Sequence, residues 1–172
     1  MEYKLNRAWA EVNLDNIASN VHEIKRIAGK KTQIMGVVKA DGYGHGVMET
    51  TKTLLDNGVS FLAVSMLDEA IQLRKNGIDV PILILSYTDP KRAEEIINYN
   101  VTQAVFSHDL ASALSEASIK LNKNVKIHIK IDTGMTRVGF MPGYIAVKSV
   151  SQISKLPGII IEGLFTHFAC AD

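Results

Sequence analysis

This sequence of 172 residues has little cysteine, little net charge and no long apolar run. Its single cysteine, Cys170, excludes an internal disulfide and favours a reducing compartment, so we expect a cytoplasmic location. The 19 Lys and Arg residues against 18 Asp and Glu residues give a formal charge of +1, which argues against nucleic acid or an anionic membrane as a partner. No run of about 18 apolar residues occurs, and the chain starts with charged residues, so we expect neither a membrane span nor an export signal.

The common phosphate and metal fingerprints are also missing. Gly42, Gly44 and Gly46 lack the third glycine of a dinucleotide-binding loop at its required offset, and no Walker-type phosphate loop occurs. His167 and Cys170 have the spacing of a zinc-binding pair, but no second pair completes four ligands, so we expect no metal. The three glycines still allow the backbone to turn tightly beside a small-molecule ligand.

The sequence does contain a regular alternation of strand-like and helix-like segments. We expect strands at residues 7–13, 33–39, 61–64, 81–85, 102–106, 125–131 and 159–165. We expect a first helix that Asp15 caps and Gly29 ends, and further helices at residues 47–57, 68–75, 90–97, 108–121 and 143–156. After the first strand, the other six recur roughly every 20 to 35 residues with a helix between, which predicts a parallel sheet of βαβ units.

Two α/β architectures fit this alternation: an open doubly wound sheet, or part of an eight-stranded (β/α) TIM-type barrel. In residues 126–132, Ile127, Ile129 and Ile131 share one face, whereas the lysines, histidine and aspartate share the other. A strand between two helix layers should be apolar on both faces, so the polar face favours a barrel interior. The chain stops soon after the sixth strand, and we therefore expect about six of the eight βα units of a barrel.

Lys39 is the first candidate catalytic residue. It stands at the carboxyl end of the short apolar segment 33–39, where parallel-sheet proteins place their chemistry. An amine there can bind an anion as a cation, or it can lose its proton and form a Schiff base with a carbonyl. The remaining possibility is a strand-end lysine that only extends its charge into solvent.

Lys130, Asp132 and Arg137 lie at and just beyond the end of the strand at 125–131. The planar fork of Arg137 suits a carboxylate or a ring oxygen, although a plain salt bridge between Asp132 and Arg137 fits the sequence equally well. Lys130 and Arg137 would repel each other at close range. We therefore expect something anionic between them.

Four other polar residues stand out, and two of them have more than one interpretation. His167, after the sixth strand, could orient a ligand, shuttle protons or be structural. Tyr43 could donate its hydroxyl to a phosphate or pack over the glycine loop. We expect His45 at a helix start, and Glu162 is a buried-looking charge that the sequence does not explain.

Four stretches together resemble the alanine racemases, the fold-type III enzymes that depend on pyridoxal 5′-phosphate: RAWAEVNLDNI at 7–17, VVKADGYGHG at 37–46, KIDTGMTRVGF at 130–140 and GLFTHFACAD at 163–172. The resemblance implies that Lys39 forms the internal aldimine and acts as the base on the D-alanine side. It implies that Tyr43 lies near the cofactor phosphate, that Arg137 hydrogen-bonds the phenolic oxygen, and that His167 lies near the pyridine ring. Lys130, which is often carbamylated in relatives, would supply the anion beside Arg137.

A complete member of that family continues with two more barrel strands and a β domain, which contributes the tyrosine base on the L-alanine side across a homodimer interface. We therefore expect residues 14–172 to form a partial cofactor-binding barrel and residues 1–13 to be a strand that belongs with the missing β domain. We expect the isolated chain to have little racemase activity, and the full-length protein to be a homodimer that supplies D-alanine for peptidoglycan.

Three alternatives stay open. The first is a non-catalytic barrel that binds pyridoxal phosphate. The second is a Schiff-base aldolase that uses Lys39 directly on a ketone. The third is a racemase for serine or for a broader range of amino acids.

Overall fold

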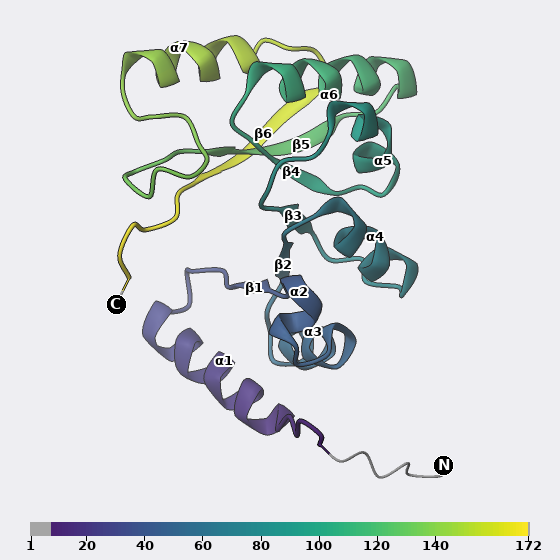
Figure 1. The fold of residues 1–172 in the computed structure, drawn as a ribbon, viewed down its shortest axis with the longest axis vertical. Coiled ribbons are helices and arrows are strands. Elements are labelled where there is room, and N and C mark those ends of the chain that lie inside the picture. Colours follow the sequence, from purple (N-terminus) through teal and green to yellow (C-terminus); the bar gives the residue numbers. More distant parts are fainter. Residues whose placement is uncertain (1–7, 172) are drawn as a thin grey trace.

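Six parallel strands form one sheet in the computed structural model, which describes residues 8–171 (Figure 1). The strands are β1 (Met35–Val37), β2 (Phe61–Val64), β3 (Ile82–Ile84), β4 (Thr102–Val105), β5 (Val125–Lys130) and β6 (Ile159–Phe165). Each strand pairs with the next one along the chain, in the order β1-β2-β3-β4-β5-β6. A doubly wound sheet reverses its strand order at one point, whereas a (β/α) barrel does not. The prediction of a partial barrel is confirmed.

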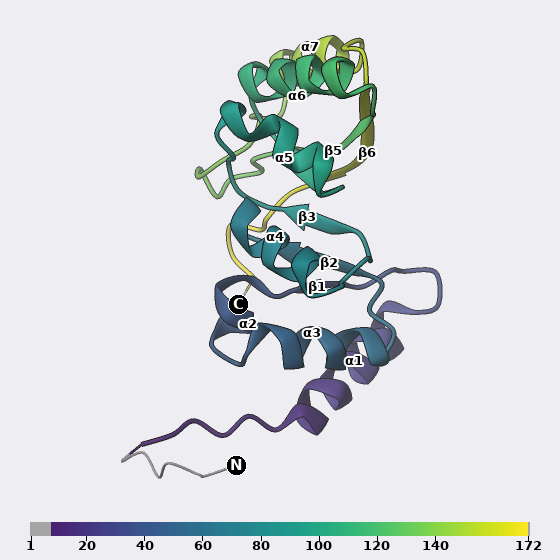
Figure 2. The same cartoon turned by 90° about the vertical axis from the view of Figure 1, so that its right-hand side faces the viewer.

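Helices connect the strands and cover the outer face of the sheet. They are α1 (Leu14–Ala28), α2 (Lys39–Tyr43), α3 (Val47–Asp56), α4 (Leu67–Lys75), the short 3-10 helix η1 (Pro90–Arg92), α5 (Ala93–Asn98), α6 (His108–Leu121) and α7 (Tyr144–Ile153). Figure 1 shows α6 and α7 side by side over β5 and β6, far from α1. In Figure 2 the sheet rises from β1, beside α1 and α3, to β6, beside α7. None of the helices in residues 8–171 is long and apolar enough to cross a lipid bilayer.

The first helix shows how local sequence sets a boundary. The side chain of Asn13 accepts hydrogen bonds from the backbone N–H groups of Asp15 at 2.9 Å and Asn16 at 3.2 Å. The predicted cap at Asp15 is therefore wrong by two positions. Asn13 is the cap, because its side chain accepts hydrogen bonds from the free N–H groups of the first turn. Asp15 instead places a negative charge in the first turn. Gly29, with φ of 79°, ends the helix as predicted.

Strand β5 confirms the predicted division between an apolar and a polar face. Ile127 and Ile129 are fully buried in the core between the sheet and the helices. Burial of each such side chain stabilises the folded state by about 1.5–3 kcal/mol relative to leaving it exposed. His128 and Lys130 point to the opposite, inner face, where Phe61 and Phe165 lie against them. A second, smaller apolar cluster on this inner face contains Ala63, Leu83 and Ala104.

Several helix and strand boundaries in the structure differ from the predicted ones. The segment 33–39 is a strand only over Met35–Val37, the segment 81–85 only over Ile82–Ile84, and the helix at 90–97 divides into η1 and α5. Of the predicted strand at 7–13, Arg7 lies outside the described residues, and residues 8–13 form neither strand nor helix. A strand requires a hydrogen-bonded partner, which alternation alone cannot supply. The assignment of residues 1–13 to a separate domain stays a prediction.

Candidate active site

A cavity of about 540 Å³ opens where the carboxyl ends of β1, β2, β3, β5 and β6 meet. It brings together all five predicted site residues. The side chains that line it are Val37, Lys39, Tyr43, Ser65, Leu85, Ser86, Tyr87, Lys130, Arg137, Val138, Phe165, Thr166 and His167. The volume falls in the range of small-molecule sites, and the lining combines apolar walls with a few polar groups. This mouth of the barrel is therefore the candidate site.

Lys39 follows β1 by two residues and is half-buried in the cavity wall. Lys39 and Val37 both line the cavity, whereas Val38 between them is buried in the core on the helix side. The Lys39 Nζ lies 5.7 Å from the centre of the Tyr43 ring. That distance is within the range of a cation–π contact. Lys39 thus lines the cavity, with its amine beside the Tyr43 ring.

The chain immediately after Lys39 is a left-handed helical turn. Ala40, Asp41, Gly42, Tyr43 and Gly44 all have positive φ, between 52° and 80°. Two backbone hydrogen bonds of 3.0 Å, from Gly42 to Val38 and from Gly44 to Ala40, close the turn. Left-handed backbone costs about 1–2 kcal/mol for each residue with a Cβ, so this segment stores strain beside the candidate catalytic amine. The sequence predicted a tight glycine loop here, but not the left-handed conformation of Ala40 and Asp41.

Lys130, at the end of β5, is buried with 4% of its surface exposed. Its Nζ donates to the Ile131 carbonyl at 3.3 Å and lies 5.2 Å from the centre of the Phe165 ring. Burial lowers the pKa of the Lys130 amine; the Asp132 carboxylate opposes this shift, and the Arg137 charge adds to it. A lysine here therefore loses its proton more readily than one in water. Lys130 and Arg137 line the same cavity, which supports the predicted proximity of the two residues.

The carboxylate of Asp132 organises the loop that carries Arg137. It accepts backbone hydrogen bonds from Gly134 at 3.0 Å, Thr136 at 2.9 Å and Arg137 at 2.8 Å. The bonds from Thr136 and Gly134 lower the pKa of Asp132 most strongly. The alternative of an Asp132–Arg137 salt bridge is wrong, because within the described residues the carboxylate bonds to backbone N–H groups and no ion pair joins the two side chains. The Arg137 side chain is left to line the cavity.

Backbone bonds close the same loop at its base. Asp132 N–H donates to the Phe140 carbonyl at 3.0 Å, and Phe140 N–H donates to the Lys130 carbonyl at 2.9 Å. Gly139, with φ of 138°, lies so close to this closure that an added Cβ would stand 2.5 Å from the Asp132 nitrogen. Only glycine fits there without moving the loop.

His167 is exposed on the cavity rim, just after β6. The neighbouring Thr166 fastens this rim to the β5 side, because its hydroxyl donates to the Ile131 carbonyl at 2.9 Å and lies 2.7 Å from the Thr133 hydroxyl. Sequence reasoning missed the hydroxyls of Ser65 and Ser86, which are 3.3 Å apart in the cavity wall. Both directly follow predicted strands, at 61–64 and 81–85, so a search for polar residues after every predicted strand would have found them.

Glu162 now has an explanation. On the inner face near the other end of the barrel, its carboxylate pairs with Lys126, lies 3.7 Å from His128 Nε2 and accepts from the Thr102 hydroxyl at 3.4 Å. Burial lowers the pKa of His128, and the charge of Glu162 only partly opposes this. These residues form a polar cluster inside the barrel, separate from the site at the mouth.

His45 lies just before α3, as predicted, with its Nδ1 3.0 Å from the Gly42 carbonyl.

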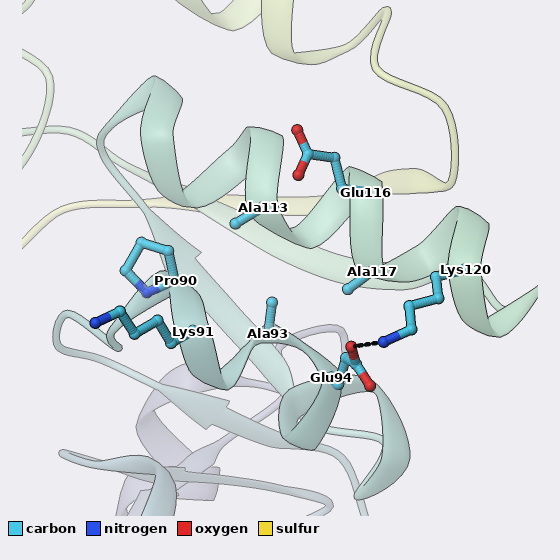
Figure 3. Close-up of a pocket in the computed structure, with 8 residues that line it drawn as sticks. All are labelled: Pro90, Lys91, Ala93, Glu94, Ala113, Glu116, Ala117 and Lys120. Atoms are coloured by element: carbon cyan, nitrogen blue, oxygen red, sulfur yellow. Dashed lines mark hydrogen bonds and ion pairs between the residues drawn. The ribbon is translucent and has the colours of Figure 1, made fainter.

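A second hollow lies on the outer surface between α5 and α6 (Figure 3). Two of its charged side chains, Glu94 and Lys120, pair with each other, and the floor is formed by the small side chains of Ala93, Ala113 and Ala117. No group of three or more His, Cys, Asp or Glu side chains in residues 8–171 could hold a metal ion. The reactive groups gather at the barrel mouth.

The chain is similar to known proteins over nearly its whole length. A family model described as "Alanine racemase, N-terminal domain" matches residues 12–172. Alanine racemase 1 of Clostridium acetobutylicum is 51% identical over 164 residues, which are 95% of this chain and 42% of that protein.

Two solved structures extend the comparison. An alanine racemase of Clostridium difficile 630 in complex with cycloserine has a TM-score of 0.91 and 44% identity, over 95% of this chain and 45% of that one. A histidine racemase of Leuconostoc mesenteroides has a TM-score of 0.86 and 30% identity, over 92% of this chain and 42% of that one. The chain therefore spans less than half the length of these proteins.

Proposed function

The chain belongs to the alanine racemase family, and from this premise we propose that it forms the cofactor-binding barrel of a pyridoxal-phosphate-dependent enzyme that interconverts L- and D-alanine. The observation that carries the proposal is the position of Lys39 at a strand end, in one cavity with Tyr43, Lys130, Arg137 and His167. Such an activity would supply D-alanine for peptidoglycan. The match to a solved alanine racemase supports alanine as the substrate.

The residues at the mouth fit pyridoxal phosphate by their chemistry. The half-buried Lys39 side chain suits an aldehyde, and the guanidinium of Arg137 suits an anionic oxygen on a ring. The hydroxyl of Tyr43 and the imidazole of His167 add polar contacts on the rim. The cofactor, when bound, supplies a ring that withdraws electrons and so acidifies the Cα–H of an attached amino acid.

The residues of this chain would then have distinct tasks. The Lys39 Nζ would hold the cofactor, and the same amine would serve as the base that takes a proton from one face of the substrate Cα. Arg137 would orient the ring through its rigid fork, on a loop that Asp132 keeps in place. Racemisation requires a second base on the opposite face. We expect this base, a tyrosine, from the part of the family's length that the chain does not span, across a homodimer interface.

The proposal is tested by incubating the native-length protein with pyridoxal phosphate and either enantiomer of alanine, followed by chiral chromatography. We expect incubation with either enantiomer to end in a racemic mixture of alanine. We also expect the enzyme to be cytoplasmic. Serine and histidine belong in the same assay, because a histidine racemase is among the similar structures. A protein that binds the cofactor but interconverts none of these amino acids would instead be a non-catalytic binder. The 172-residue chain alone is expected to show little activity.

A separate prediction concerns Lys130. We propose that its neutral amine adds carbon dioxide, forming an N–C bond and releasing one proton, so that a carbamate anion lies beside Arg137. The burial of Lys130 and the lowered pKa of its amine favour the neutral form that this reaction needs. Carbon-13 NMR in labelled bicarbonate should show one carbamate resonance that is lost in Lys130→Ala. Identical spectra for the two proteins would contradict the modification.

A further inference from the structure

The left-handed turn that follows Lys39 requires contacts that stabilise it. Ala40 and Asp41 have positive φ, a conformation that residues with a Cβ seldom adopt unless their surroundings enforce it. On the downstream side, Asp41 fastens the turn to α3, because its Oδ1 accepts from the Val47 N–H at 2.8 Å. On the upstream side, the peptide that joins Lys39 to Ala40 is fastened by a residue from the next βα unit.

That residue is Glu69, in the first turn of α4. Its Oε1 accepts from the Ala40 N–H at 2.7 Å, across 29 positions of sequence. Its Oε2 accepts from the N–H groups of Ser65 at 2.7 Å and Met66 at 2.9 Å. The two oxygens of one half-buried carboxylate thus join the turn after β1 to the loop after β2, and Ser65 itself lines the cavity.

The cap of α4 explains only half of this arrangement. A glutamate three residues into a helix commonly reaches back to the start of its own helix in a capping box. The bonds to Ser65 and Met66 serve that purpose. The bond from Ala40 is of no use to α4. It fixes the plane of the peptide from which the Lys39 side chain departs.

We propose that Glu69 is a positioning residue for Lys39: its carboxylate clamps the Lys39–Ala40 peptide and thereby directs the amine into the cavity. This inference rests on the proposed function, because it assigns Glu69 to the same site. A charged acceptor makes stronger hydrogen bonds than a neutral one, and a rigid support is what a reactive amine needs to keep its geometry. Glu69 does not itself touch the reacting atoms.

The test is Glu69→Gln in the native-length protein. Glutamine also serves in capping boxes, so its oxygen can keep the cap of α4 while its NH₂ group faces the Ala40 N–H, where two donors meet. We expect kcat for alanine to fall about tenfold, as for loss of one charge-assisted bond, while KM changes much less. The rate at which pyridoxal phosphate attaches covalently to Lys39, measured by absorbance and by borohydride reduction, should fall in parallel with kcat.

The matched control is Asp68→Asn, which removes the same charge one position earlier on α4. Asp68 pairs with Arg92 at 2.8 Å on the surface, whereas the Ala40 N–H of the turn bonds to Glu69. This control should keep the parent kcat and attachment rate. Equal losses in the two variants, or a parent-like Glu69→Gln, would overturn the clamp. Glu69→Asp, which keeps the charge but is one methylene shorter, is the second variant, and it should also slow attachment.

Amide hydrogen exchange separates this inference from the proposed function. In the parent protein the Ala40 N–H should exchange slowly, and in Glu69→Gln it should exchange markedly faster, whether or not any racemase activity is found. The same Ala40 exchange rate in both proteins would refute the clamp. A parent protein with a protected Ala40 amide but no reaction with pyridoxal phosphate would refute the proposed function and leave the structural part of the inference standing.

Discussion

Replacement of Lys39 with alanine is expected to abolish both covalent attachment of pyridoxal phosphate and interconversion of alanine, with a fall in kcat of about 10⁴-fold or more. The loss should be this large because one amine has two tasks, holding the cofactor and moving the Cα proton. Of the two lysines that line the cavity, Lys130 is the less suited to this role, because it is buried and faces Phe165 and the Ile131 carbonyl. Borohydride reduction followed by peptide mass spectrometry should find the cofactor label on Lys39 in the parent protein and nowhere in the variant.

Lys52→Ala is the control for this experiment, because Lys52 is an exposed residue of α3, away from the cavity. It should retain both label and activity. A label that maps to a different lysine, or a Lys39→Ala protein with substantial turnover, would contradict the assignment. Reduction in the presence of a ketone but without pyridoxal phosphate tests the aldolase alternative, which requires a trapped adduct under those conditions.

The second large effect is expected for Gly139→Ala. A Cβ at this position would lie 2.5 Å from the Asp132 nitrogen and 2.7 Å from the Ile131 carbonyl carbon, both backbone atoms that cannot step aside. The loop would have to open at its base, where the Asp132–Phe140 and Phe140–Lys130 backbone bonds close it. Displacement of Arg137 by even 1 Å is expected to lower kcat/KM about 10²-fold. Overpacking should also lower the free energy of unfolding by about 1–3 kcal/mol.

The same loop offers a closely matched control. Gly134 has φ of 131°, similar to the 138° of Gly139, but an added Cβ there would meet only the Ala169 side chain, at 3.9 Å. Gly134→Ala therefore introduces the backbone strain without the clash. We expect a much smaller loss of kcat/KM and of thermal stability than in Gly139→Ala. If both variants lose the same activity, the cause is the glycine conformation and not the closure of the loop.

Much of the fold could be predicted from sequence because its signals are local. The apolar face of Ile127 and Ile129 and the polar face of His128 and Lys130 follow from the two-residue period of a strand, and the structure places the two faces as this period requires. Lys39, Lys130 and His167 could be selected because each stands at or just beyond the end of a predicted strand. The cap at Asn13 was missed, since Asn13 and Asp15 offer similar side chains and only the backbone path decides between them.

The partners of the polar groups could not be predicted in the same way. Asp132 and Arg137 have opposite charges and lie five residues apart, which suggested a salt bridge, but the loop folds so that backbone N–H groups reach the carboxylate first. The role of Glu69 was invisible for a similar reason. Its bond to Ala40 spans two βα units, and no pattern within a short window contains both residues.

The sequence by itself determined the order of the six sheet strands and of the main helices, the polar strand ends and the lysine on which the proposed chemistry depends, because each is encoded in the periodicity or in the short motifs of neighbouring residues. Only the tertiary structure decided how that lysine is supported: the left-handed turn after it, the carboxylate that clamps the turn and the closed loop that presents Arg137. The physical reason is that a hydrogen bond forms with whichever group comes within about 3 Å, and for distant segments that choice is made when the strands assemble side by side.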